Sequence, residues 1–254
     1  MHVSALDKLL WAVTFSADAA LLLVLLLRGR WRQFPVFTVW IAFLAARTVA
    51  LFLIFADGPP HLYARVYWLA VWPDFLLQLG VAIEIARIVL RPTGTWVRDA
   101  RLQFWTAGLA GAALAALFAW WVTPAAHSAL AVWRLRGNLF TSLVICEVFV
   151  AMSTTASRLG LGWRNHVMAL GQGLTAWSAL TLMTDSLQAL LGAHHDYTGL
   201  ANIRSASYLA AALWITVQLW APEPERHPIS PDLHDYILEL HRRVEYDLRR
   251  LDAK

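Results

Sequence analysis

The sequence predicts an all-α, polytopic membrane protein: a bundle of seven transmembrane helices followed by a C-terminal cytoplasmic amphipathic helix. Two features of composition indicate this class. Of the 254 residues, 59% are hydrophobic and only 15% are charged, whereas soluble domains carry about 25% charged residues. The third observation is a series of apolar runs of about 20 residues, the length that a helix needs to cross a bilayer.

Polar or proline-containing connections separate the apolar runs, and the prolines cannot continue a helix. The predicted transmembrane domain covers residues 1–220, with helices at about 9–27, 34–56, 64–90, 102–122, 137–157, 167–191 and 200–220. The third run contains Asp74, Gln78 and Glu84. Because polar groups in hydrocarbon need surrounding helices, we expect this helix to form the core of the bundle.

Arginines indicate the orientation. They concentrate in the loops after the first, third and fifth helices and in the C-terminal tail. The positive-inside rule therefore places the N-terminus outside and the C-terminus in the cytoplasm, and the expected location is the cell (inner) membrane. The net charge of +4 follows from these arginines, so nucleic-acid binding is not expected.

The tail forms a separate predicted unit. Residues 221–231 are a proline-rich linker, and residues 232–254 contain an amphipathic helix that ends near residue 252. Its apolar residues recur at steps of three and four, which is typical of a helix with one apolar face. This helix either lies on the membrane, docks on the bundle, or pairs with another copy or a partner protein.

Polar residues inside the predicted spans are the candidate functional groups. Each central charge costs on the order of 2.5–3.5 kcal/mol on insertion scales. Such groups therefore either bind a ligand or ion in an outward-facing cavity, or hold the helices together through hydrogen bonds. The candidates are Asp18, Arg47, Asp74, Gln78, Glu84, Glu147, Ser178, Thr181, Asp185, Gln188 and Arg204.

Helical spacing predicts partners for several of these groups. Arg47 is the one basic residue near the centre of a span, so we expect it to pair with Asp18, Asp74 or Glu147. Glu84 lies within reach of Arg87 and Arg91 on its own helix.

Two polar faces are expected to line the cavity. One holds Asp74 and Gln78. The other is a stripe of residues with steps of three and four on the sixth helix, namely Ser178, Thr181, Asp185 and Gln188.

Several chemistries receive little support. His194 and His195 are weak candidates for metal binding, because histidines in three different outer loops lack a ligand spacing within one element. The only lysines are Lys8 and Lys254, so no lysine in the seventh helix is present to bind retinal. The familiar hydrolase, metalloprotease and nucleotide-binding motifs do not occur, and an enzyme is not expected. The cofactor content is left open.

Two stretches, WRQFPVFTVWIAFLAART and YARVYWLAVWPDFLLQLGVAIEIARIVLRP, carry a resemblance. The pattern is an R-x-F-P-x-F entry to the second helix, an aromatic Y-x-x-x-Y-W entry to the third and an acidic residue, Glu84, near its inner end. In these features the chain resembles a group of bacterial seven-helix membrane proteins with no assigned activity. The resemblance covers roughly residues 10–220 and implies the topology alone.

Three functions fit these patterns. The first is a non-enzymatic sensor, in which an outer polar cavity binds a small ligand and the cytoplasmic helix signals to a partner. The second is a transporter of small solutes, or one coupled to protons. The third is an accessory subunit, in which the charges hold a larger membrane complex together.

Overall fold

The computed structural model describes residues 5–57, 59–90, 97–122, 129–158, 166–191 and 198–222. The chain divides into two units, Met1–Pro222 and Glu223–Lys254, and only the first contains described residues. The predicted amphipathic helix, nearly all of the linker, and the histidines His194 and His195 lie outside the described residues.

The described chain is entirely helical. It contains seven α-helices and one short 3-10 helix, η1: α1 (Ala5–Leu27), η1 (Arg30–Arg32), α2 (Pro35–Asp57), α3 (Pro60–Leu90), α4 (Val97–Trp121), α5 (Ala129–Arg158), α6 (His166–Leu191) and α7 (Thr198–Trp220). Six of the seven α-helices begin earlier than their apolar runs suggest, and four of them, α1, α3, α4 and α5, begin at least four residues earlier. The largest difference is in α5, which begins eight residues before the predicted start, so that Arg134 and Arg136 belong to the helix.

Four helices contain segments that are long and apolar enough to cross a membrane: Leu9–Leu27, Pro35–Ala56, His61–Ile88 and Ala129–Thr154. A shorter apolar segment, Gly108–Trp121, lies in α4. These segments identify a helical protein of membrane-like composition. In α6 and α7, polar residues such as Asp185 and Arg204 interrupt the apolar sequence.

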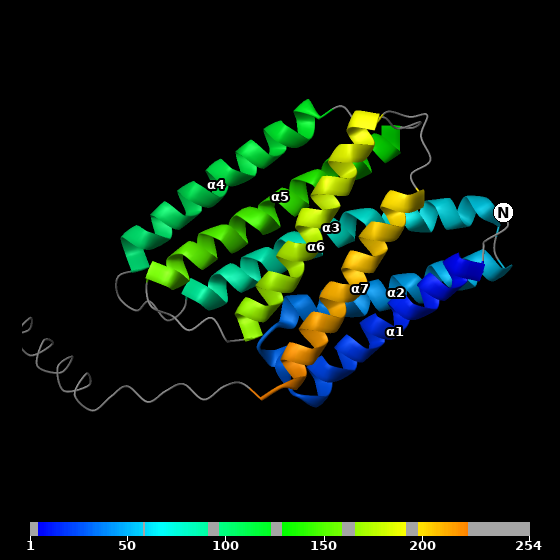
Figure 1. Cartoon of the computed structure of the whole chain (residues 1–254), viewed down its shortest axis with the longest axis horizontal. Coiled ribbons are helices and arrows are strands. Elements are labelled where there is room, and N and C mark those ends of the chain that lie inside the picture. The colour runs from blue at the N-terminus through cyan, green and yellow to red at the C-terminus, as the bar shows by residue number, and fades with distance from the viewer. Residues whose placement is uncertain are drawn as a thin grey trace, which may run out of the picture. The chain divides into compact units, whose positions relative to one another are not determined.

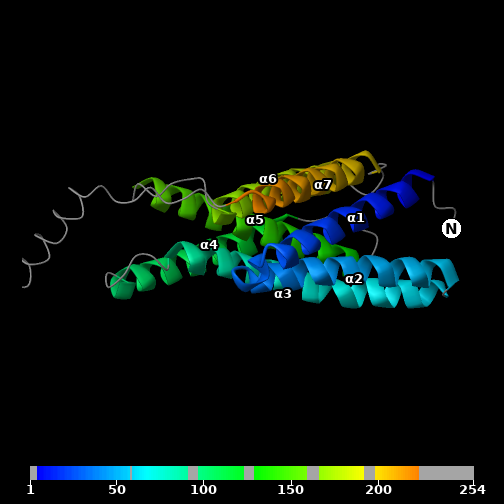
Figure 2. The ribbon, with the colours of Figure 1, turned by 90° about the horizontal axis from the view of Figure 1, so that it is seen from below.

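Six helices pack in a closed ring, in the order α1, α2, α3, α5, α6, α7 and back to α1. The remaining helix, α4, packs on the outer side of α5 and takes no place in the ring (Figure 1). Figure 2 shows α2 and α3 in one layer and α6 and α7 in another, with α1 leading from one to the other. The third helix contributes Val81 and Ile85 to the core, as expected, but it does so as one of six ring members and not as a central helix. Its Leu69 and Leu76 are 72% and 71% exposed.

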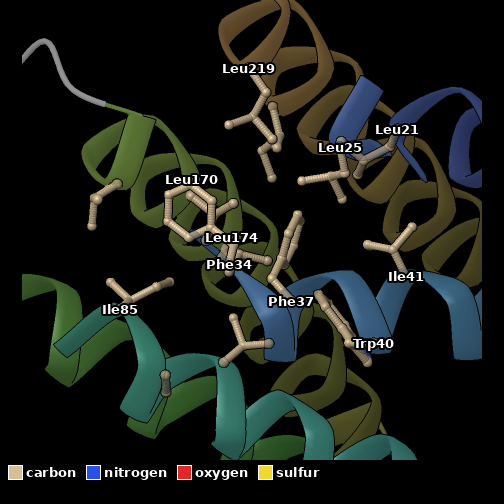
Figure 3. Close-up of a cluster of buried hydrophobic side chains, with 14 of the residues drawn as sticks. Leu21, Leu25, Phe34, Phe37, Trp40, Ile41, Ile85, Leu170, Leu174 and Leu219 are labelled. Carbon is tan, nitrogen blue, oxygen red and sulfur yellow. The ribbon is translucent and has the colours of Figure 1, made fainter. Parts of the chain in front are cut away.

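One half of the ring is filled by tightly packed apolar side chains (Figure 3). Phe34 just before α2, Phe37 of α2, Leu25 of α1, Leu170 of α6 and Leu219 of α7 are completely buried there. This half lies toward η1, the end at which α1 and α7 finish. Dense aromatic and aliphatic packing of this kind leaves only small apolar voids.

Two glycines let α3 approach its neighbours in the ring closely. A Cβ atom at Gly137 of α5 would lie 2.3 Å from the ring of Phe75 of α3, and one at Gly80 of α3 would lie 2.9 Å from Val36 of α2. Both distances are below normal contact, so a side chain at either position would push the helices apart. The small residues therefore fix how closely α3 packs against its two neighbours in the ring.

Glu84 of α3 caps the N-terminus of α2. Its two carboxylate oxygens accept hydrogen bonds from the backbone N–H groups of Val36 at 2.8 Å and Phe37 at 2.9 Å. Pro35 has no N–H to satisfy, and the N–H of Thr38 donates to the carbonyl of Phe34 at 3.0 Å. The first turn of α2 is thus fully satisfied, and the carboxylate also stabilises the positive end of the helix dipole.

This arrangement corrects the expectation that Arg87 and Arg91 satisfy Glu84. Arg91 lies outside the described residues, and both oxygens of Glu84 are already bonded to a different helix. The contact also joins the two motifs noted in the sequence, because the F-P-x-F segment supplies the donors and the acidic residue of the third helix supplies the acceptors. Glu84 is therefore a structural residue, 8% exposed and away from the cavity described next.

Candidate functional site

A polar cavity of about 260 Å³ lies within the ring. All six ring helices contribute to its wall, and α4 contributes nothing. The cavity extends from the end where α3, α5 and α7 begin to the middle of the bundle, above the apolar half. Its polar and aromatic lining residues are Thr14, Asp18, Trp40, Arg47, Thr48, Tyr67, Asp74, Phe75, Gln78, Arg134, Asn138, Thr141, Ser142, Trp177, Thr181, Arg204, Ser205 and Tyr208.

Asp74 is the centre of a network between α2 and α3. Its Oδ2 accepts a hydrogen bond from the Arg47 guanidinium at 2.8 Å. Its Oδ1 accepts from the indole N–H of Trp40 at 2.8 Å and from the amide of Gln78 at 3.2 Å. Asp74 is thus the partner of Arg47 among the three carboxylates that were considered. Asp18 also lies close enough to Arg47 to interact with it electrostatically.

A second ion pair joins α6 and α7 across the cavity from the first. Arg204 donates to Oδ1 of Asp185 at 3.1 Å. The Asp185 side chain is 1% exposed and lies behind the cavity wall, whereas the Arg204 side chain is 30% exposed and lines the wall. A charge buried this deeply needs such a partner, because its solvation is lost.

Two further contacts connect the wall through tyrosine hydroxyls. The Tyr208 hydroxyl of α7 donates to Asp18 of α1. The Arg134 guanidinium of α5 donates to the Tyr67 hydroxyl of α3. Each contact bridges two neighbouring helices of the ring, so the lining side chains also tie the ring together.

The stripe predicted on the sixth helix is divided by the structure. Thr181 lines the cavity, and Asp185 lies directly behind it through its contact with Arg204. Ser178 is completely buried and does not belong to the lining. Gln188 also lies outside the lining. One helix face therefore serves both the cavity and the helix packing.

Glu147 faces away from the cavity, toward α4. A Cβ atom built on Gly111 of α4 would lie 2.5 Å from its Oε2, so the missing side chain at Gly111 makes room for this carboxylate. Glu147 is not among the cavity-lining residues and is not bonded to Arg47. The sequence places it at the right depth for the cavity, but α5 turns it to the other side.

Sequence reasoning missed a polar face of α5. Arg134, Asn138, Thr141 and Ser142 line the cavity from this helix. Their steps of four, three and one place them on one helical face, and this spacing is the signal that could have found them. The apolar run begins at residue 137, so the run alone predicts a helix that excludes Arg134.

Aromatic side chains form the floor of the cavity. The rings of Trp40 and Trp177 lie 6.0 Å apart, and those of Trp177 and Tyr208 lie 5.6 Å apart. These three side chains also line a small apolar pocket on their other side, together with Leu21, Phe37 and Leu174. The aromatic floor, meaning Trp40, Trp177 and Tyr208, therefore separates the polar cavity from the apolar half of the bundle.

Among the described residues, no group of three or more histidine, cysteine, aspartate or glutamate side chains is placed to hold a metal ion. Comparison of the chain with protein-family models, curated proteins and solved structures finds no match. The fold and the site thus define a helical bundle of membrane-like composition with a polar cavity among its described residues. The function is therefore inferred from the geometry of that cavity.

Proposed function

We propose that the protein is a seven-helix integral membrane protein of the inner membrane that binds a small solute from outside the cell and acts as a sensor. The observation that carries this proposal is the cavity, which is polar and open in one half of the ring and backed by tightly packed apolar side chains in the other. A solute in it touches all six ring helices, so binding biases how they pack.

The proposed orientation places the cavity on the outer side. Arg28, Arg30 and Arg32 lie at the opposite end of the bundle, where the positive-inside rule places the cytoplasm. There the guanidinium of Arg28 stacks over Trp220 at 4.5 Å. Tryptophan and arginine at such a boundary suit the interface between lipid and water.

Cysteine labelling tests the membrane, the orientation and the cavity together. Cys146 is the only cysteine of the chain, so Cys146→Ala gives a background without thiols. In sealed spheroplasts we expect a membrane-impermeant maleimide to label Ser205→Cys, which lies in the cavity wall. Leu69→Cys, on the outer surface of α3, should remain unlabelled because lipid covers it and suppresses the reactive thiolate.

The outcome separates the alternatives. In the bare protein Leu69 is 72% exposed, so a soluble protein would be labelled at Leu69→Cys at least as fast as at Ser205→Cys. Labelling of Ser205→Cys only after the spheroplasts are broken would reverse the orientation. Either result would contradict the proposal.

A transporter is the second candidate, and the aromatic floor favours it. Trp40, Trp177 and Tyr208 alone contact both the cavity and the small pocket beyond it. A rearrangement of these three side chains would begin to open a path toward the inner half. In a transporter the site would then become accessible from the cytoplasm.

Flux measurements separate the two candidates. For a sensor we expect the purified protein in proteoliposomes to bind solute without moving it, and removal of residues 222–254 to abolish capture of a cytoplasmic partner. Solute or proton flux that Asp74→Asn weakens would instead establish the transporter. Stoichiometric co-purification with other membrane chains, with neither binding nor flux, would favour an accessory subunit.

A further inference from the structure

We infer that the solute is a small carboxylate anion with an apolar or aromatic body, and that Arg134 of α5 binds its carboxylate group. This inference rests on the outward-facing cavity proposed above. It adds the chemical class of the ligand and the residue that recognises it.

The ion pairs of the cavity, rather than its net charge, indicate where an anion would bind. Three guanidinium groups line the wall, from Arg47, Arg134 and Arg204, and three carboxylates balance them, namely Asp18 and Asp74 in the wall and Asp185 behind it. Arg47 donates to Asp74, and Arg204 donates to Asp185 behind the wall. In the described part of the chain, Arg134 has no such ion pair.

The surroundings of Arg134 leave its charge available. Its guanidinium donates a hydrogen bond to the Tyr67 hydroxyl, a neutral group, and its Nε is buried without a hydrogen-bond partner. Asp185 is close enough to interact with Arg134 electrostatically, but its Oδ1 accepts from Arg204 and its Oδ2 has no hydrogen-bond partner, so Asp185 makes no hydrogen bond to Arg134. A guanidinium in this position gains from an anion that enters the cavity, because its own solvation is reduced.

The donors around Arg134 suit a carboxylate. Guanidinium donors form a planar fork that matches the two oxygens of a carboxylate. Asn138 and Ser142 line the same wall from α5, and Tyr67 lines it from α3. The hydroxyl groups of Ser142 and Tyr67 can complete the hydrogen bonds of the bound anion, whereas the Asn138 side chain already interacts with Asp185.

The opposite end of the cavity suits an apolar group. The aromatic floor presents Trp40, Trp177 and Tyr208 toward the cavity, and Phe75 adds another ring to the wall. Aromatic faces bind apolar and aromatic ligand groups through large buried areas. The volume of about 260 Å³ is below the range of roughly 300–1,000 Å³ that is usual for drug-sized ligands. The ligand is therefore small.

The test uses the full chain in lipid nanodiscs and matched probes. Acetate, hexanoate, benzoate and phenylacetate are the carboxylates; phenylacetamide is the uncharged analogue and phenethylamine the cationic one. Inorganic phosphate tests for an anion without an apolar body. We expect hexanoate, benzoate or phenylacetate to raise the unfolding temperature and to slow maleimide labelling of Ser205→Cys. The amide, the amine and phosphate should do neither.

Two arginines of one helix supply the matched variants. Arg134→Gln should weaken carboxylate binding roughly 10- to 100-fold, the effect of a lost charge-assisted hydrogen bond. Arg136→Gln should leave it unchanged, because Arg136 stacks on Trp120 and Trp133 outside the cavity. Arg134→Lys keeps the charge but loses the planar fork, so its affinity should be intermediate. If Arg134→Gln does not fold, the lysine variant still tests the residue.

Three results would overturn the inference: equal binding of phenylacetamide and phenylacetate, equal effects of Arg134→Gln and Arg136→Gln, or no binding of any carboxylate at millimolar concentrations. If these occur while Ser205→Cys is still labelled from outside, the ligand class is wrong and the outward cavity stands. If Ser205→Cys is not labelled from outside, the outward-facing cavity itself is wrong, and with it the proposed function.

Discussion

Glu84→Ala is expected to destabilise the bundle by roughly 2–4 kcal/mol, because two N–H groups at the start of α2, the buried one of Phe37 and the partly buried one of Val36, would lose their acceptors. A buried donor without a partner costs about 1–3 kcal/mol, and the apolar surroundings of Phe37 offer no water as a substitute. Reversible unfolding in mixed detergent micelles would measure the loss.

Two variants give this prediction its controls. Glu84→Gln keeps one carbonyl oxygen as an acceptor and should lie between the wild type and Glu84→Ala. Arg87→Ala, one turn further along α3, removes an exposed side chain and should change the stability by less than about 0.5 kcal/mol. If Arg87→Ala lowers the stability as much as Glu84→Ala, the Glu84 carboxylate is stabilised mainly by an ion pair on its own helix. Its hydrogen bonds to the start of α2 would then contribute little.

Asp74→Ala is expected to destabilise the protein by roughly 2–4 kcal/mol. It removes the acceptor of the Arg47 guanidinium, the Trp40 indole and the Gln78 amide. Loss of one partner of a buried pair costs about 3–5 kcal/mol. We expect somewhat less here because the Arg47 side chain is 29% exposed, so water in the cavity screens its charge.

A double-mutant cycle tests whether the ion pair is the cause. Arg47→Met removes the charge and keeps most of the length of the side chain. If the pair dominates, the double variant Arg47→Met/Asp74→Ala should be more stable than the sum of the single effects predicts, because no unpaired charge is left behind. Strictly additive effects would show that the two residues act independently.

Both residues lie where α3 meets α2, but at different depths of the bundle. Glu84 belongs to the apolar half and Asp74 to the cavity wall. Glu84 can therefore serve stability alone, whereas Asp74 also sets the charge and the position of Arg47 inside the site. Variants of Asp74 are expected to change ligand binding as well as stability, and variants of Glu84 mainly stability.

The sequence by itself predicted the seven helices and most of their limits, because long apolar runs and proline-containing breaks are local properties of the chain. It also identified Asp18, Arg47, Asp74, Gln78, Thr181 and Arg204, which the structure brings together around one cavity. These residues stand out because a polar group in an apolar run is unusual wherever the helix packs.

The tertiary structure alone decided which neighbour each polar group meets. Helical spacing shows which residues share a face but not which helix lies opposite that face. Thus Glu84 bonds to backbone groups of α2 rather than to arginines one turn away. Glu147 faces α4, and Arg134 enters the cavity because α5 extends beyond its apolar run. Packing between segments that are distant in the sequence determines these partners. A local sequence pattern does not show which helix will lie opposite a given face.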